Sequence, residues 1–253
     1  MKHNKIFIYG KHAVSEALEH TPKAVTRIFK VPKIDDANLN HLIKESGVQV
    51  SPFTEGAARS DMKKDTAHQG VIAQLSLVDL VTPFDRFMEK LTIGPDTVLV
   101  LMAGVTDPHN VGAIIRTAAG FGAVAVLMPD SNQAPISGTV VKVSAGMAFR
   151  IGLVNIPPVD ATISQLKKKG FKIYGLAGEG KAVITDEDFP GPTVIVVGNE
   201  AQGLSSEIRK TCDQVLSIPI HPQCESLNVA AATAVALYSW STHHKPALSP
   251  RWR

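Results

Sequence analysis

Cysteine is scarce in this chain, and its two copies form no pattern that binds a metal or builds a disulfide framework. Only Cys212 and Cys224 occur among 253 residues. Disulfide-stabilised secreted domains carry several cysteines at regular spacings, and zinc sites need further cysteine or histidine ligands close by. The nine histidines are scattered and include no His-Glu-x-x-His pair. We therefore predict that the protein uses no metal and works in a reducing compartment, the cytoplasm.

Long apolar runs and a large charge of one sign are also missing. The apolar stretches Val98–Val105 and Ala230–Trp240 fall short of the ~20 residues that a membrane-spanning helix needs. The N-terminus has no apolar run of the kind that marks a signal peptide. We therefore expect no membrane partner. The net charge of +3 permits an RNA partner without indicating one.

The chain does contain apolar residues in two patterns, and the first pattern fills residues 1–76. Four short apolar runs predict strands, and helical periodicity lies between them. The runs are Ile6–Tyr9, Val25–Val31, Val48–Val50 and Val71–Leu75. They predict a small α/β domain over residues 1–76. Residues 77–95 contain Pro83 and the pair Gly94-Pro95, so we predict a linker there.

From residue 96 the pattern becomes a regular alternation of strands and helices. Several apolar runs are continuous, which is typical of parallel strands covered on both faces. The predicted strands are Val98–Ala103, Val124–Met128, Gly152–Ile156, Lys172–Leu176, Val194–Val197 and Val215–Ile220. The predicted helices are Val111–Phe121, Ser137–Phe149, Asp160–Lys169, Ser205–Thr211 and Leu227–Trp240. We therefore predict a doubly wound α/β domain over residues 96–242 and a frayed tail at residues 243–253.

Three polar loops follow strands of this second domain, and ligands of doubly wound domains bind at such strand ends. The loops are Gly104–Gly112, Gly198–Gly203 and the start of Ile218–Leu237. Each has a plain structural interpretation as well. Asn110, Ser226 or Asn228 could simply cap helices, and the glycines of the second loop could form a tight turn. Arg116 lies inside an otherwise apolar helix, where an arginine is either solvated or paired.

Motifs of other enzyme classes are incomplete or absent. The stretch Gly175–Ala182 nearly fits the phosphate-binding P-loop, but Ala182 stands where the pattern needs Ser or Thr to hold magnesium. No GxGxxG dinucleotide motif and no GxSxG nucleophile elbow occurs. The sequence therefore gives no support to nucleotide hydrolysis, dinucleotide binding or a serine hydrolase.

Taken together, the three loops resemble the motifs of the SpoU (TrmH-type) RNA 2′-O-ribose methyltransferases of the SPOUT superfamily. The resemblance covers residues 96–240, and the three motifs in order are highly specific. The matching segments are Asp107–Ala118, Val196–Leu204, Ile218–Ile220 and Ser226–Ala230. The N-terminal part also resembles the substrate-recognition domain of the branch that acts on ribosomal-RNA guanosines. There the resemblance rests on Ile8–Val14 and His68–Val71.

This resemblance implies a fold, a cofactor and a partner. It implies that the second domain ends in a trefoil knot that binds S-adenosylmethionine, and that the first domain binds RNA. It also implies a homodimer, to which the small-residue helix Val229–Ala236 contributes. The implied cofactor-binding residues are Ala177, Gly178, Gly198, Asn199, Gly203, Ile218, Ile220 and Leu227.

The implied reaction is methyl transfer to a ribose 2′-hydroxyl of RNA, above all of a guanosine in 23S ribosomal RNA. It needs alignment of the reacting groups and stabilisation of a developing alkoxide, but no metal. Because arginine stays protonated in proteins, we expect Arg116 to stabilise the alkoxide and a neighbouring phosphate. Asn110, Ser226 and Asn228 would orient the ribose or Arg116. Glu200 would hold Arg116 or Asn110.

Two alternatives stay open on the sequence. The substrate could be transfer RNA, although the additional N-terminal domain favours ribosomal RNA. The chain could also bind RNA without methylating it, although a retired enzyme is expected to lose part of the set formed by Asn110, Arg116, Glu200 and Asn228, and this set is intact.

Overall fold

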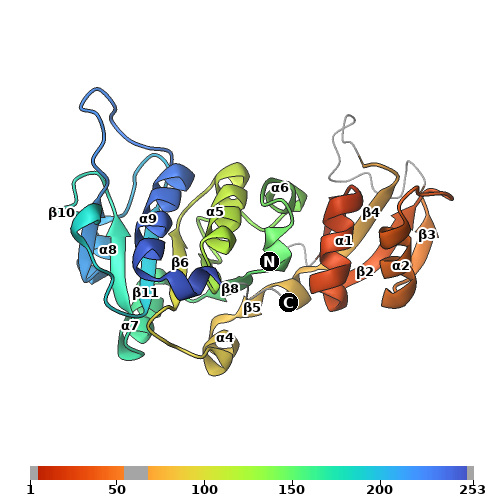
Figure 1. Cartoon of the computed structure of the whole chain (residues 1–253), viewed down its shortest axis with the longest axis horizontal. Helices are drawn as coiled ribbons and strands as arrows, with labels where there is room; N and C mark the ends of the chain where they lie inside the picture. Colours follow the sequence, from red (N-terminus) through yellow and green to blue (C-terminus); the bar gives the residue numbers. More distant parts are fainter. Residues whose placement is uncertain (1–4, 54–67, 250–253) are drawn as a thin grey trace.

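A computed structural model of the protein describes residues 5–53 and 68–249. Figure 1 shows two α/β units side by side, a smaller N-terminal unit and a larger C-terminal unit. The described residues therefore cover most of the predicted first domain, all of the second and the first part of the predicted tail. The rest of those predictions, at residues 1–4, 54–67 and 250–253, lies outside them.

The N-terminal unit is a four-stranded mixed sheet in the order β1-β4-β2-β3, in which only β3 runs parallel to its neighbour. Its strands are β1 (Lys5–Tyr9), β2 (Val25–Lys30), β3 (Val50–Pro52) and β4 (Val71–Ser76). Its helices are α1 (Lys11–His20), the 3-10 turn η1 (Pro22–Ala24) and α2 (Ala37–Ser46). Asp36 caps α2 by accepting from the Leu39 N–H, and Gly47 ends it with a φ of 63°. The predicted small α/β domain is confirmed.

The C-terminal unit is an eight-stranded sheet in the order β10-β12-β9-β11-β6-β7-β8-β5, and all its pairs are parallel. Its longer strands are β6 (Val98–Ala103), β7 (Ala125–Pro129), β8 (Gly152–Ile156), β9 (Lys172–Leu176), β11 (Thr193–Gly198) and β12 (Gln214–Ser217). The two short edge strands are β5 (Thr82–Pro83) and β10 (Ala182–Val183).

Helices cover both faces of this sheet, because its strands are apolar on both sides. On β6, Val98 and Val100 belong to one core while Leu99 and Leu101 belong to the other. The first core is covered by α5 (Pro108–Gly120), α6 (Gly138–Val143) and α9 (Val229–His243). The second is covered by α4 (Phe84–Lys90), α7 (Val159–Lys168) and α8 (Ser206–Thr211). The predicted doubly wound parallel sheet is confirmed, and no described helix has the length and apolarity to cross a membrane.

Two predicted elements are shorter than expected. The predicted helix Ser137–Phe149 divides into α6 and the 3-10 turn η2 (Met147–Phe149), because Ala145 and Gly146 adopt positive φ values of 51° and 81°. The predicted strand Val215–Ile220 ends at Ser217, just before Pro219, which has no N–H to continue a ladder. The segment after Ser217 is therefore a loop that follows the carboxyl end of β12.

The junction between the units is structured rather than a loose linker. The segment predicted as a linker at residues 77–95 forms α3 (Leu77–Leu80), β5 and α4. β5 pairs with β8 at the edge of the large sheet, and Phe84 of α4 is 2% exposed in the second core. Apolar side chains in this segment therefore anchor the junction to the C-terminal unit.

The prediction of a frayed tail is wrong for residues 243–249. His244 is buried: its Nδ1 lies 2.8 Å from Asp96 Oδ1 and its Nε2 lies 2.9 Å from the Phe189 carbonyl oxygen. The 3-10 turn η4 (Lys245–Leu248) follows. Ala247 packs on Gly122, where a side chain would overlap the Ala247 backbone. These polar and packing contacts hold residues 244–247 on the first core. A further 3-10 turn, η3 (Ile184–Asp186), contributes Ile184 to the same core.

An ion pair joins the two units. Arg150, which follows η2, donates to Glu16 of α1 through Nε at 2.7 Å and Nη2 at 2.8 Å. The Glu16 side chain is only 9% exposed. Because this bidentate geometry satisfies both carboxylate oxygens in a partly buried place, the pair fixes how the units dock.

Replacing Arg150 with methionine is expected to destabilise the protein by about 3 kcal/mol, because the Glu16 carboxylate stays partly buried without its partner. The hydrogen bond from Arg150 lowers the pKa of Glu16 below its usual 4.5. The pair's contribution is therefore present above that pH and is lost as pH falls through the folded-state pKa. Urea unfolding at about pH 7 and about pH 3 measures this difference. An equal difference at both pH values, or an equal loss in Arg86→Met, would contradict the assignment.

Candidate active site

The candidate site lies where four neighbouring parallel strands end. β12, β9, β11 and β6 are consecutive in the sheet, so the loops that follow them meet at one edge. A cavity of about 410 Å³ opens there between the loops after β6, β11 and β12. Its lining residues are Thr106, Asp107, Asn110, Asn199, Glu200, Ala201, Ser226, Leu227, Asn228 and Val229. The three motif loops are thus brought together.

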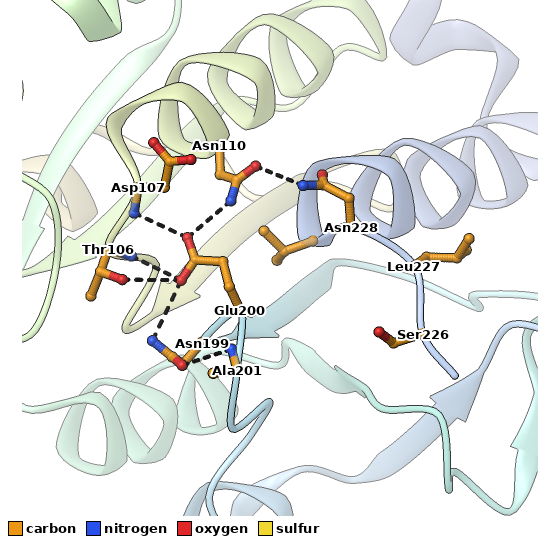
Figure 2. Close-up of a pocket in the computed structure, with 10 residues that line it drawn as sticks. Thr106, Asp107, Asn110, Asn199, Glu200, Ala201, Ser226, Leu227 and Asn228 are labelled. Carbon is orange, nitrogen blue, oxygen red and sulfur yellow. Dashed lines mark hydrogen bonds between the residues drawn. The ribbon is translucent and has the colours of Figure 1, made fainter. Parts of the chain in front are cut away.

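Glu200 ties the loop after β11 to the loop after β6 (Figure 2). Its Oε1 accepts from the Asp107 N–H and from Asn110 Nδ2, both at 3.0 Å. Its Oε2 accepts from the N–H and the hydroxyl of Thr106, both at 3.2 Å. These partners lie 90 to 94 residues away in sequence. One carboxylate therefore fixes both the loop after β6 and the first turn of α5.

The same hydrogen bonds keep the Glu200 carboxyl ionised. Partial burial by itself would raise its pKa, but the hydrogen bonds from Asn110 and from the backbone of Asp107 and Thr106 outweigh it and lower the pKa to about 2. Glu200 is therefore a carboxylate throughout the physiological range, and it is a very weak base. Its chemistry suits holding donors in place rather than taking a proton from a substrate.

Asn228 connects the loop after β12 to this network. Its Oδ1 accepts from the Ala230 N–H at 2.9 Å and the Ala231 N–H at 3.3 Å, so it caps α9. Its Nδ2 donates to Asn110 Oδ1 at 2.9 Å. The amide of Asn228 is therefore held at both ends, and its place in the site is set by the start of α9.

Asn110 is the bridge between the motif loops. It does not cap α5, because Asp107 does so by accepting from the His109 N–H at 2.8 Å. The Asn110 amide is instead shared between Glu200, to which it donates, and Asn228, from which it accepts. Of the two roles expected for Glu200, holding Asn110 is the one that the structure shows.

Asn199 and two glycines shape the loop after β11. The backbones of Asn199 and Gly203 exchange hydrogen bonds of 3.0 and 2.8 Å, and Asn199 Nδ2 donates to the Gly104 carbonyl at 2.9 Å. Gly203 has a φ of 64°, and a side chain at Gly198 would overlap the Gly203 backbone. These positions need glycine for the turn itself, which places Glu200 at the cavity.

Two of the eight predicted cofactor residues, Asn199 and Leu227, line the cavity. The others belong to the end of β11 or to the loops after β9, β11 and β12. They are Ala177, Gly178, Gly198, Gly203, Ile218 and Ile220. Gly178 has open space where a side chain would stand, and Leu227 is 37% exposed. Exposed backbone beside apolar side chains suits an apolar ring with polar edges, so these residues fit S-adenosylmethionine.

Arg116 stands apart from the other predicted catalytic residues. It lies on α5 six residues beyond Asn110, it is exposed, and it does not line the cavity. Among the described residues it forms no ion pair within 4.0 Å. Ser226 does line the cavity and is exposed. Within the described part of the chain only its carbonyl oxygen forms a hydrogen bond, which it accepts from the Cys224 thiol.

The sequence interpretation missed Thr106 and Asp107. Both lie in the loop between β6 and α5, and both donate backbone N–H groups to Glu200. A backbone donor leaves no trace in residue type, so only the hydroxyl of Thr106 and its place before Asn110 could have signalled them.

Comparison with known proteins decides the family. Residues 97–238, more than half of the chain, match the model of the SpoU rRNA Methylase family. The chain belongs to this family. Residues 7–79 match a second model, described as RNA 2′-O ribose methyltransferase substrate binding. Membership of the SpoU family confirms the predicted enzyme class, an RNA 2′-O-methyltransferase that uses S-adenosylmethionine.

Individual SpoU relatives extend over nearly the whole chain. The 23S rRNA (guanosine-2′-O-)-methyltransferase RlmB of Pseudomonas syringae pv. tomato is 35% identical over 91% of this chain and 93% of its own length. The SpoU methyltransferase AviRb of Streptomyces viridochromogenes, solved with AdoMet, shares the fold with a TM-score of 0.84 at 24% identity, over 96% of this chain and 91% of that one. A TrmH/SpoU tRNA modifying enzyme of A. aeolicus covers only 60% of this chain and 77% of its own, at 27% identity and a TM-score of 0.53.

Proposed function

We propose that this SpoU enzyme transfers a methyl group from S-adenosylmethionine to the ribose 2′-hydroxyl of a guanosine in 23S ribosomal RNA. The observation that carries the proposal is the cavity in which Glu200, Asn110 and Asn228 join three motif loops. The RlmB relative supports the substrate, because its similarity extends over both units. A cytoplasmic location fits such a substrate.

The side chains of the cavity orient the ribose. The chain of hydrogen bonds from Asn228 through Asn110 to Glu200 presents fixed amide groups at the start of α5 and α9. A 2′-hydroxyl reacts only as it loses its proton, so its oxygen must be aligned and its growing negative charge stabilised. The Ser226 hydroxyl can share in orienting the ribose. Arg116 lies outside the cavity of its own chain, so its guanidinium would stabilise the alkoxide in the cavity of a second copy.

The loops beside the cavity hold the cofactor in this proposal. Bound S-adenosylmethionine would supply an electrophilic methyl group. Exposed backbone at Ala177 and Gly178 would meet its polar edges, while Ile218, Ile220 and Leu227 would pack on its apolar parts. The chemistry therefore falls between these loops and the Asn110 amide.

The chain path supports the trefoil knot that the family resemblance implies. In the sheet, β12 and β11 lie on opposite sides of β9. The chain nevertheless returns after β12, because the next helix, α9, packs against α5, which follows β6. Residues 218–228 therefore turn back across the ends of β9 and β11. In a crystal structure of the protein, a knotted backbone would stay knotted when its trace is straightened with both ends held fixed. A trace that reduces to an unknotted line would contradict the knot.

Exposed apolar side chains support a homodimer that uses α5 and α9. Tyr238 and Val235 of α9 are 61% and 38% exposed, and Arg116 lies on the neighbouring α5. Burial of this surface by a second copy would remove it from water. Analytical ultracentrifugation should give twice the chain mass of 27.0 kDa. A single-chain mass at micromolar concentration would contradict the dimer.

Two other functions are tested against this proposal. Transfer RNA as substrate is disfavoured because the tRNA-modifying relative of A. aeolicus covers only 60% of this chain. RNA binding without catalysis is disfavoured by the intact hydrogen-bond network of the cavity.

The deciding experiment uses labelled S-adenosylmethionine with ribosomal and transfer RNA from cells that lack the protein. We expect label in 23S ribosomal RNA, and primer extension should stop at a single guanosine. Label in transfer RNA would establish the first alternative, and label in no RNA would overturn the proposed function.

A further inference from the structure

A second cavity lies between the two units. Like the active site, it lies at the carboxyl ends of strands of the large sheet. Its volume is about 550 Å³, which is within the range of small-molecule sites. The N-terminal side contributes Ile6 of β1 and Leu77 of α3, and the C-terminal side contributes Met128 and Ile136. Most of the lining is apolar, so a flat, largely apolar group with a polar edge would fit.

The polar groups of this cavity have unused hydrogen-bonding capacity. Gln133 Oε1 accepts from the Val105 N–H at 3.1 Å, which fixes the orientation of its amide. Gln133 Nε2 is then buried, and it has no hydrogen-bond partner among the described residues. Asn155 Nδ2 donates to one oxygen of Asp130 at 3.1 Å, and Asp130 forms no ion pair within the described ranges. The cavity therefore offers one oriented carboxylate, and the unpartnered Gln133 amide lies in its wall.

From these groups we propose that the second cavity binds a guanine base of the substrate RNA, an inference that rests on the proposed function. The pairing edge of guanine has two adjacent donors, N1–H and N2–H, beside the acceptor O6. The Asp130 carboxylate accepts from the two donors, and Gln133 lines the same cavity. Adenine presents an acceptor at N1, which the carboxylate repels. Lys5, on the lining, adds a cation that suits a backbone phosphate.

Val105 connects the second cavity to the active site. Val105 donates to Gln133 and accepts from the Ala134 N–H at 2.9 Å, so the loop after β7 is fixed to the loop after β6. The next residue, Thr106, lines the active-site cavity and binds Glu200. An RNA strand whose ribose lies in the active site therefore has a base within reach of Asp130 and Gln133.

The test compares three nucleotides that share a phosphate and a purine ring. Guanosine, inosine and adenosine 5′-monophosphates are titrated into the full chain, and binding is followed by NMR. We expect the affinity order guanosine, inosine, adenosine, because inosine lacks the 2-amino donor. Asp130→Asn should weaken guanosine monophosphate binding about tenfold or more and remove its advantage over inosine monophosphate. Asp160→Asn, at an exposed position on α7, should change neither.

A second measurement separates this inference from the proposed function. In the methylation assay, Asp130→Asn should raise KM for RNA at least tenfold and leave kcat within about twofold, because a binding contact remote from the reacting atoms is lost. Circular dichroism confirms that the variant is folded. If the native enzyme methylates no RNA, the proposed function fails. If it methylates RNA but binds the three nucleotides equally, or if Asp130→Asn keeps the guanosine preference, the guanine site is wrong.

Discussion

Replacing Arg116 with alanine is expected to lower the rate of methyl transfer by about a thousandfold, while the affinity for S-adenosylmethionine stays nearly unchanged. The reason is that a fixed cation lowers the energy of a developing alkoxide far more than that of the neutral hydroxyl. Arg116 lies outside the cofactor loops, so its loss leaves them intact. Single-turnover methylation and calorimetric titration of S-adenosylmethionine measure the two quantities. Native turnover in Arg116→Ala would refute the assignment, and Arg86→Ala is the control for loss of an exposed arginine.

The position of Arg116 indicates which cavity of the proposed dimer it acts on. It is exposed on α5 and does not reach the cavity of its own chain. We expect it to act on the cavity of the second copy in the proposed dimer. Mixing inactive Arg116→Ala and Asn228→Ala chains should then restore up to about a quarter of native activity, because half of the dimers are mixed and each has one complete site. No restored activity would place Arg116 with its own cavity.

Replacing Glu200 with glutamine is expected to lower kcat/KM about a hundredfold, equivalent to about 2.7 kcal/mol of transition-state stabilisation. The carboxylate accepts from four donors on Thr106, Asp107 and Asn110. An amide has one oxygen, so its NH₂ group would face two of these donors and leave them unpaired. The loop after β6 and the Asn110 amide would then lose their fixed positions. Steady-state methylation at varied RNA concentration measures the effect.

The ionisation of Glu200 determines how the stability loss in Glu200→Gln depends on pH. Because its pKa is lowered to about 2, the network's contribution to stability is present above the usual value of 4.5 and is lost as pH falls towards 2. The difference in unfolding free energy between the native chain and Glu200→Gln should therefore shrink in acid. Glu207→Gln, at an exposed residue of α8, should leave activity unchanged. A loss of activity equal to that of Glu200→Gln would show a general effect of removing a surface carboxylate.

Local patterns were sufficient for much of the fold. The strands β6, β8 and β9 match their predicted bounds. In β6 the reason is a continuous apolar run, which marks a strand buried on both faces. Helix starts followed residue type too, as Ser205 and Asn228 cap α8 and α9. Patterns failed where distant residues decide the conformation. The residues around His244 do not indicate its polar contacts with Asp96 and the Phe189 carbonyl. Likewise, the residues around Pro83 do not indicate that β5 pairs with β8.

The sequence by itself determined the order of strands and helices, the three polar loops and the residue types that identify the SpoU family. Only the tertiary structure decided how those residues are used. In the structure the Glu200 carboxylate accepts a hydrogen bond from Asn110 rather than from Arg116. The unpaired Gln133 amide and Asp130 both belong to residues that line a second cavity. The physical reason is that propensity and periodicity act within a few residues. Hydrogen bonds between loops depend on which strands become neighbours in the sheet.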